Sequence, residues 1–296
     1  MEKTLTHVKI APKGMGLNDF VAQREGFLED EGLDVEFDWK TFHGTQSSWK
    51  QFKYFERPQD KPYAEGEQVI QCACLWGTIS NASAGMGRVV PDCYGISPWA
   101  IFVRPDSKIH KPEDLKDVPI GVGMRAGSHF NVPYRLEPYL PLENIKTVNI
   151  GGFSARLKAL LEGEVEAASL LPPQIDMAGQ LGLRKIMDNT FPTLWWVPEN
   201  SPTETVRGYL RALDRAERAL EADLGKYLEM WKICIPPEFE DRKWDFARFT
   251  RGEKFVYKPL PKETFDEVFK QVERWGLDQH TREHSYDKLT LSVGAA

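Results

Sequence analysis

A short pattern occurs twice in this sequence, once in each half of the chain. In the first copy Gly66-Glu67 precedes an apolar run over residues 69–75, and in the second Gly163-Glu164 precedes a similar run over residues 165–171. A helix-like stretch comes before each copy, and a short extended segment comes before that helix. Two half-chains with the same order of elements predict two similar lobes. Because ligands tend to bind at domain interfaces, the repeat also predicts a cleft between the lobes.

Length and charge exclude several classes of function. A chain of 296 residues is long enough for two hydrophobic cores. Its net charge of −6 comes without the clustered basic face that nucleic-acid binding needs, so no nucleic-acid partner is expected. No apolar run approaches the ~18 residues that span a bilayer, so no membrane span is expected.

The beginning of the sequence leads directly into the first expected strand, over residues 7–11, without an apolar signal core. This predicts a cytoplasmic protein if the sequence is native and full length. It predicts a periplasmic or lipid-anchored protein if a signal peptide was removed.

Strands that alternate with helices predict an α/β protein, in which mostly parallel sheets are flanked by helices. The last hundred or so residues carry helical periodicity, so a helical C-terminal third is expected. The polar segment 57–65 contains two prolines and is predicted to be an exposed loop. Cys72 and Cys74 share one face of an expected strand, and without further ligand spacing they are predicted to be small buried residues, not a zinc site.

Four strings of residues resemble a known family in the same order. They are residues 24–37 (REGFLEDEGLDVEF), 111–116 (KPEDLK), 160–167 (LLEGEVEA) and 206–213 (VRGYLRAL). Together they resemble periplasmic-binding-protein-like domains of the second type, in the branch that contains sulfonate, nitrate and thiamine-precursor binding proteins. The resemblance implies a hinged two-lobed clamshell, with lobe one at residues 1–98 plus 196–296 and lobe two at residues 99–195. It also implies a ligand between the lobes and an ABC permease as partner.

Loops that follow the first three strands supply the expected ligand contacts of lobe one. Lys13 and Met15 lie in a glycine-rich turn, which brings backbone close to a ligand or simply connects a strand to a helix. His43 follows the second strand and is either a titrating ligand contact or a surface residue. Trp76 and Thr78 follow the third strand, where the indole is either a flat wall for a planar ligand or part of the core.

Lobe two offers the strongest local signal, at the expected start of a helix. Arg125, Ser128 and His129 combine a permanent charge with small polar groups at a helix N-terminus, which suits a carboxylate, sulfonate or phosphate. The alternative for Ser128 is a plain helix cap. Pro173 is a further wall candidate after the last strand of this lobe.

Tryptophans mark the two expected crossings between the lobes. Trp99 lies at the first crossing, and Trp195 and Trp196 lie at the second. Neighbouring residues of a strand face opposite sides, so at most one of this pair faces the ligand; Trp195 is the candidate, and which of the two faces the cleft stays open. His280 and His284 have a metal-like spacing, but no third ligand accompanies them, so no metal site is predicted.

Two functions fit these features. The first is a substrate-binding protein of an ABC-type importer that holds a small organic anion, with an aromatic ring as one option. The alternative is a cytosolic enzyme on the same fold, a decarboxylase, hydrolase or lyase without a cofactor. In that enzyme His43 and His129 would act as acid and base from opposite lobes.

Overall fold

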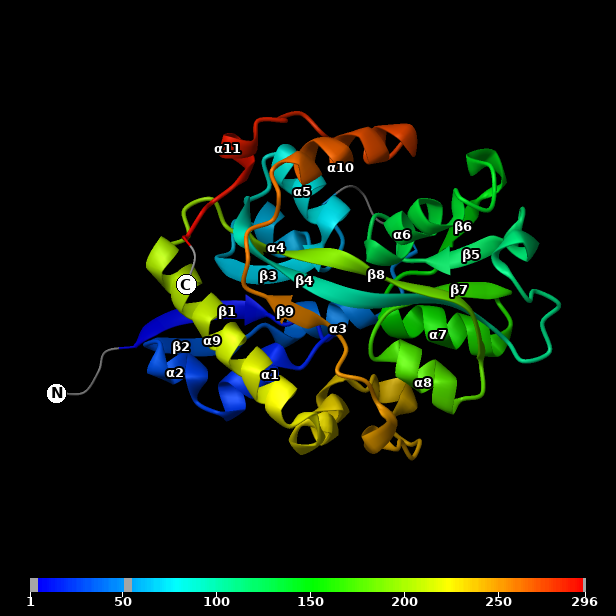
Figure 1. The fold of residues 1–296 in the computed structure, drawn as a ribbon, viewed down its shortest axis with the longest axis horizontal. Helices are drawn as coiled ribbons and strands as arrows, with labels where there is room; N and C mark the ends of the chain where they lie inside the picture. Colours follow the sequence, from blue (N-terminus) through cyan, green and yellow to red (C-terminus); the bar gives the residue numbers. More distant parts are fainter. Residues whose placement is uncertain (1–4, 51–54, 295–296) are drawn as a thin grey trace.

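The computed structural model describes residues 5–50 and 55–294. Its strands form a 9-stranded sheet with the order β2-β1-β3-β8-β4-β7-β5-β6, and β9 pairs with β4 (Figure 1). The strands are β1 (Thr6–Ala11), β2 (Leu33–Phe37), β3 (Val69–Cys74), β4 (Arg88–Val103), β5 (Pro119–Val122), β6 (Lys146–Asn149), β7 (Ala167–Leu170), β8 (Arg184–Val197) and β9 (Lys254–Val256).

Helices cover the sheet, and they dominate the C-terminal third as expected (Figure 1). The α-helices are α1 (Asn18–Arg24), α2 (Phe27–Asp30), α3 (Trp39–Gln46), α4 (Lys61–Ala64), α5 (Leu75–Ser83), α6 (Gly127–Leu136), α7 (Phe153–Glu162), α8 (Gln174–Gln180), α9 (Thr203–Ala222), α10 (Glu263–Arg274) and α11 (Tyr286–Leu289). The α/β class predicted from the alternating pattern is confirmed.

The repeated pattern of the sequence is visible in the topology. In one lobe β1 lies between β2 and β3 and is parallel to both, and in the other β5 lies between β6 and β7 and is parallel to both. Gly66 (φ 76°) and Gly163 (φ 76°) both adopt the left-handed conformation. Glycine reaches this conformation without steric cost, so each Gly-Glu pair marks where a helix ends and the chain reverses into a strand.

Two long antiparallel strands, β4 and β8, connect the lobes through the middle of the molecule (Figure 1). Their pairing runs from Arg88 opposite Val197 to Val103 opposite Arg184. The predicted crossings at Trp99 and Trp195 therefore fall within these strands. The arrangement is a two-lobed clamshell, while the boundaries at residues 98 and 195 stay a prediction.

The end of α3 in lobe one docks on the start of α7 in lobe two. The N–H of Gly152 donates to the carbonyl of Ser47 at 2.8 Å, and Ser154 Oγ donates to the carbonyl of Gln46 at 2.6 Å. A Cβ at Gly152 would lie 2.2 Å from the carbonyl oxygen of Thr45. Glycine is thus needed for the close approach of the two backbones, which closes one side of the interlobe space.

Candidate functional site

A cavity lies between the lobes where the first turns of three helices meet. Cys74 and Gly77 at the start of α5, Ala126 and Gly127 at the start of α6, and Phe153 of α7 all line it. Helix N-termini carry partial positive charge and N–H groups without helical acceptors. The cavity volume is about 60 Å³. By the same measure, one water molecule needs roughly 10–15 Å³. The space fits a compact ligand, and the starts of α5 and α6 add partial positive charge to its wall, whereas the start of α7 already faces the carbonyls at the end of α3.

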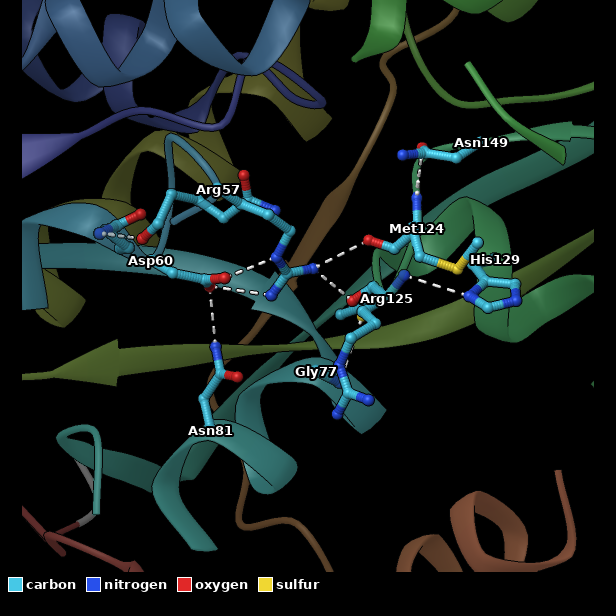
Figure 2. A network of polar contacts seen from close by, with 11 residues as sticks. Arg57, Asp60, Gly77, Asn81, Met124, Arg125, His129 and Asn149 are labelled. Carbon is cyan, nitrogen blue, oxygen red and sulfur yellow. Dashed lines mark hydrogen bonds and ion pairs between the residues drawn. The ribbon is translucent and has the colours of Figure 1, made fainter. Parts of the chain in front are cut away.

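A buried network ties Arg57 of lobe one to lobe two. The Arg57 guanidinium donates to both carboxylate oxygens of Asp60, through Nε at 2.5 Å and Nη2 at 2.8 Å, and Asn81 of α5 donates to the same carboxylate at 3.0 Å. Arg57 Nη1 also donates to the carbonyls of Arg125, at 2.6 Å, and Met124, at 3.3 Å (Figure 2). Arg57 is 3% exposed and Asp60 1% exposed, so the prediction of an exposed loop over residues 57–65 is wrong. Mutual ion pairing lets both charges be buried, which a count of polar residues does not reveal.

Arg125 lines the cavity from the turn before α6 and is buried. Its φ of 58° is unusual for a residue with a side chain. Bonds on several sides hold this conformation: its N–H donates to His129 Nδ1 at 3.1 Å, and its carbonyl accepts from Arg57 (Figure 2). Its Nη1 also donates to Gln279 Oε1 at 3.0 Å. The structure thus places this predicted residue at the cavity.

Lys13 lines the same cavity from the opposite lobe. Its Nζ lies 5.9 Å from the centre of the Phe191 ring and 3.9 Å from Glu253 Oε2. No hydrogen-bond acceptor for this Nζ is found among the described residues. Lys13 and Arg125 are the predicted side chains that the structure brings together at one cavity, one from each lobe.

Ser128 lies behind the cavity wall and connects it to a fully buried arginine. Ser128 Oγ accepts hydrogen bonds from the N–H of Gly123 at 2.9 Å and from Arg156 Nη1 at 2.6 Å. Arg156 of α7 is 0% exposed, and burial lowers the pKa of its guanidinium to about 9. Within residues 5–50 and 55–294, Nε and Nη2 of Arg156 have no hydrogen-bond partner and no carboxylate forms an ion pair with it. The wall at α6 and α7 therefore contains a buried charge that the described protein does not neutralise.

The two histidines of the enzyme alternative do not meet. His43 lies in α3, where a loop was expected, and its exposed ring contacts Phe42 and Trp39 away from the cavity lining. His129 is 7% exposed, and its Nδ1 already accepts the N–H of Arg125. Burial, with smaller contributions from Arg125 and Arg57, lowers the pKa of His129 to about 4. A neutral, hydrogen-bonded imidazole in this position supports the Arg125 turn.

The predicted tryptophans lie in the core. Trp76 packs on Phe130 and Tyr134, and Trp99 is 0% exposed and donates to Ser169 Oγ at 2.6 Å. Trp195 packs edge-on against Phe255 and lines a smaller neighbouring cavity, while Trp196 lines the main cavity. Neighbouring residues of β8 thus face opposite sides, and it is Trp196 whose side faces the main cavity.

Met15, Thr78 and Pro173 are also buried and do not line the main cavity, although Met15 lines the smaller neighbouring one. Thr78 belongs to α5, where only the first turn reaches the cavity. Pro173 follows Leu171, which does line the cavity. Each of the three lies one or two positions from a residue that does line the main cavity, namely Lys13, Gly77 and Leu171.

Several lining residues had no clear signal in the sequence. Trp49, Phe153 and Arg57 looked like ordinary loop or helix residues, although the Arg57-x-x-Asp60 spacing is one at which an ion pair forms. Cys72 and Cys74 both line the cavity, and Cys74 Sγ accepts the N–H of Gly77 at the start of α5. Burial raises the pKa of both thiols, so these cysteines are unreactive at neutral pH.

Two further observations concern metals and membranes. Across the described ranges, no three His, Cys, Asp or Glu side chains gather as metal ligands do. None of the described helices has the length and apolar character needed to cross a bilayer.

Comparison with solved structures identifies the fold. The alkanesulfonate-binding protein SsuA from Xanthomonas axonopodis pv. citri, bound to MOPS, superposes with a TM-score of 0.68 at 14% sequence identity, covering 97% of this chain and 98% of that chain. The CA3427 gene product of Candida albicans, described as having the generic periplasmic binding protein fold, gives a TM-score of 0.69 at 13% identity, over 96% and 95% of the two chains. This chain has the periplasmic-binding-protein fold of the second type.

The same periplasmic-binding-protein fold also carries catalysis in at least one neighbour. The desulfurization enzyme DSZB has a TM-score of 0.58 at 15% identity, over 97% of this chain and 96% of that one. No protein-family model and no curated protein matches the sequence. At such low identity the likeness shows the fold, and the function has to be argued from the site.

Proposed function

We propose that this protein binds a compact organic anion in the cavity between its lobes, as the substrate-binding component of an ABC-type importer. The ligand would lie between lobe one (residues 1–98 and 196–296) and lobe two (residues 99–195). The observation that carries the proposal is the buried charge of Arg156, which lies 5.2 Å from the centre of the Phe153 ring in the cavity lining and forms no ion pair with a carboxylate of the described chain. A bound anion would supply the missing negative charge.

Other features of the cavity support an anion and limit its size. Lys13 and Arg125 approach from opposite lobes, and the start of α5 adds a helix N-terminus. The volume of about 60 Å³ corresponds to roughly four to six water molecules. Trp196 and Phe191 in the lining favour a ligand with one ring or a short chain next to its acid group.

The enzyme alternative lacks an equivalent observation, because neither His43 nor His129 lines the cavity. The receptor proposal also places the protein outside the cytoplasm, next to a permease. That location and that partner are parts of the proposal.

Titration calorimetry with a matched set of ligands tests the proposal. Benzenesulfonate, benzoate and methanesulfonate represent the expected class, and benzamide and benzylammonium are the neutral and cationic controls. The buffer should contain no sulfonate, because the related SsuA protein binds MOPS. We expect saturable binding of at least one anion and none of the controls.

Variants show whether binding takes place in this cavity. Lys13→Met should weaken anion binding by about tenfold or more, since it removes one charge from the lining. Lys158→Met is the control, because Lys158 lies on α7 but is exposed and pairs with Glu162. Equal binding of the neutral control, or unchanged affinity in Lys13→Met, would overturn the proposal.

A further inference from the structure

A small second cavity lies directly behind the main one. Lys13 and Cys72 line both cavities, and Asp19 and Glu253 line only the inner one. The inner volume is about 20 Å³, enough for one water molecule at roughly 10–15 Å³. Lys13 therefore separates the proposed anion site from a pair of acidic side chains.

Asp19 of α1 is held in an environment that favours its neutral form. Burial raises the pKa of Asp19 to about 6; the charge of Glu253 adds to this, and a hydrogen bond from Tyr209 of α9 opposes it. The Tyr209 hydroxyl lies 2.5 Å from Asp19 Oδ1. The thiols of Cys72 and Cys234 are the other titratable groups that sense Asp19, and burial raises the pKa of each.

Glu253 depends on Lys13 for its charge balance. Glu253 is 8% exposed, and its Oε2 has no hydrogen-bond partner in the part of the chain that the structure describes. Lys13 Nζ lies 3.9 Å from that oxygen, and Cys72 Sγ lies 3.6 Å from Oε1. The nearby Arg251 pairs with Glu217 of α9.

We propose that the Asp19–Glu253 pair is a proton site coupled to the anion site, so that an anion in the main cavity engages Lys13 and the acid pair takes up a proton. This rests on the proposed function. Lys13 lines both cavities, so an Nζ that turns to an anion in the main cavity no longer offsets the charge of Glu253 in the inner one. When the anion takes the lysine, Glu253 loses its cation, and its uncompensated charge beside the same small cavity favours the protonated form of Asp19.

The sign of the linkage follows from this charge balance. The anion raises the pKa of Asp19 above its value in the free protein, so the complex binds more protons than the free protein does near neutral pH. Anion affinity should therefore increase as pH falls from 8 to 6. The increase approaches about tenfold for each unit by which the pKa of Asp19 rises.

A pH-stat titration measures the proton uptake directly. Benzenesulfonate is the probe, because it remains ionised throughout, and the protein is held in unbuffered potassium chloride between pH 6 and pH 7. We expect wild-type protein to take up a measurable fraction of a proton for each anion bound. Asp19→Asn should bind the anion without this uptake and with an affinity that no longer depends on pH.

Control variants separate the acid pair from other buried acids. Asp176→Asn removes another carboxyl whose pKa burial raises, on α8 beside Thr250, and it should leave the uptake unchanged. Glu253→Gln should reduce the uptake as Asp19→Asn does, which provides a second variant if the first folds poorly. Binding without proton uptake, or full uptake in Asp19→Asn, would overturn the inference alone. A protein that binds none of the anions overturns both this inference and the proposed function.

Discussion

The two lobes repeat one order of strands, yet they treat a buried arginine in opposite ways. In lobe one Arg57 is ion-paired with Asp60, and Asn81 supports the carboxylate. In lobe two Arg156 is buried at least as deeply and has only Ser128 and the carbonyl of Gly151 as hydrogen-bond acceptors among the described residues. The order of strands is thus repeated in the two lobes, but the ion pairing of the buried arginine is not.

The ion-paired and the unpaired arginine have different roles in the two lobes. A paired charge is internally satisfied, and Arg57 uses its remaining donors to hold the turn at Met124 and Arg125 (Figure 2). An unneutralised charge costs stability unless a ligand completes it. Arg57 of lobe one therefore positions the turn before α6. Arg156 of lobe two keeps a positive charge that the proposed anion would neutralise.

The largest effect is expected for Arg57→Met. This variant leaves Asp60 buried without its cation, which costs about 3–5 kcal/mol of the free energy of unfolding. Urea denaturation measures the loss. Arg218→Met is the control, because Arg218 pairs with Asp214 on the exposed face of α9 and should change stability by less than about 1 kcal/mol. If both variants lost a similar amount of the free energy of unfolding, the buried Arg57–Asp60 pair would not be a main source of stability.

His129 should make the stability of the protein depend on pH. Its pKa of about 4 lies below the ordinary value of 6.5, so the unfolded chain binds the proton first when the solution is acidified. Stability present above pH 6.5 is then lost as pH falls towards 4, by about 2 kcal/mol between pH 7 and pH 5. His129→Gln keeps an acceptor for the N–H of Arg125 but should lack this loss. An equal loss in both proteins, measured by urea denaturation, would show that other groups cause the pH dependence.

Arg156→Met addresses the difference between the two arginines directly. Because it leaves no buried carboxylate unpaired, it should cost about 2 kcal/mol less stability than Arg57→Met. The same variant should weaken anion binding by about tenfold, or 1.4 kcal/mol, because the charge behind α6 and α7 is gone. Calorimetry and denaturation on the same samples measure both. If Arg156→Met bound the anion as tightly as the wild-type protein, the unpaired charge of Arg156 would not contribute to binding, and the proposed function would lose its main support.

The smallest effect is expected for Gln279→Ala. Gln279 holds the side chain of Arg125 from the C-terminal segment through one hydrogen bond at the edge of the cavity. Its removal should change the free energy of unfolding by less than about 0.5 kcal/mol. A loss close to that of Arg57→Met would mean that the side chain of Arg125, more than its backbone, positions the turn.

Periodicity and glycine placement were enough to predict the framework. The Gly66 and Gly163 pairs identified two equivalent helix-to-strand reversals, and the topology confirms them. Local patterns succeed here because each reversal depends on residues that are neighbours in the sequence. The long β4–β8 ladder joins residues from both ends of lobe two, and it was apparent only as two separate extended segments.

The site was less predictable, because its charges are arranged across the chain. Lys13 and Arg125 were expected at the cavity, whereas Arg57 and Arg156 were not. Arg57 lay in a segment whose composition indicated exposure, and only its pairing with Asp60 explains the burial. Arg156 lay in a helix with an apolar face, where nothing local distinguishes an inward arginine from an outward one.

The long ladder also bears on how such a molecule evolves. Phe102 pairs with Lys185 and Val103 with Arg184, so the chain leaves for the outer part of lobe two and returns from it on adjacent strands. The segment in between also meets the framework through the pairing of β7 with β4, the contact of α7 with α3 and the bonds of Arg57 to the turn before α6. A segment exchanged between Val103 and Arg184 during evolution would therefore have to keep a strand beside β4 and the backbone contacts with α3 and Arg57.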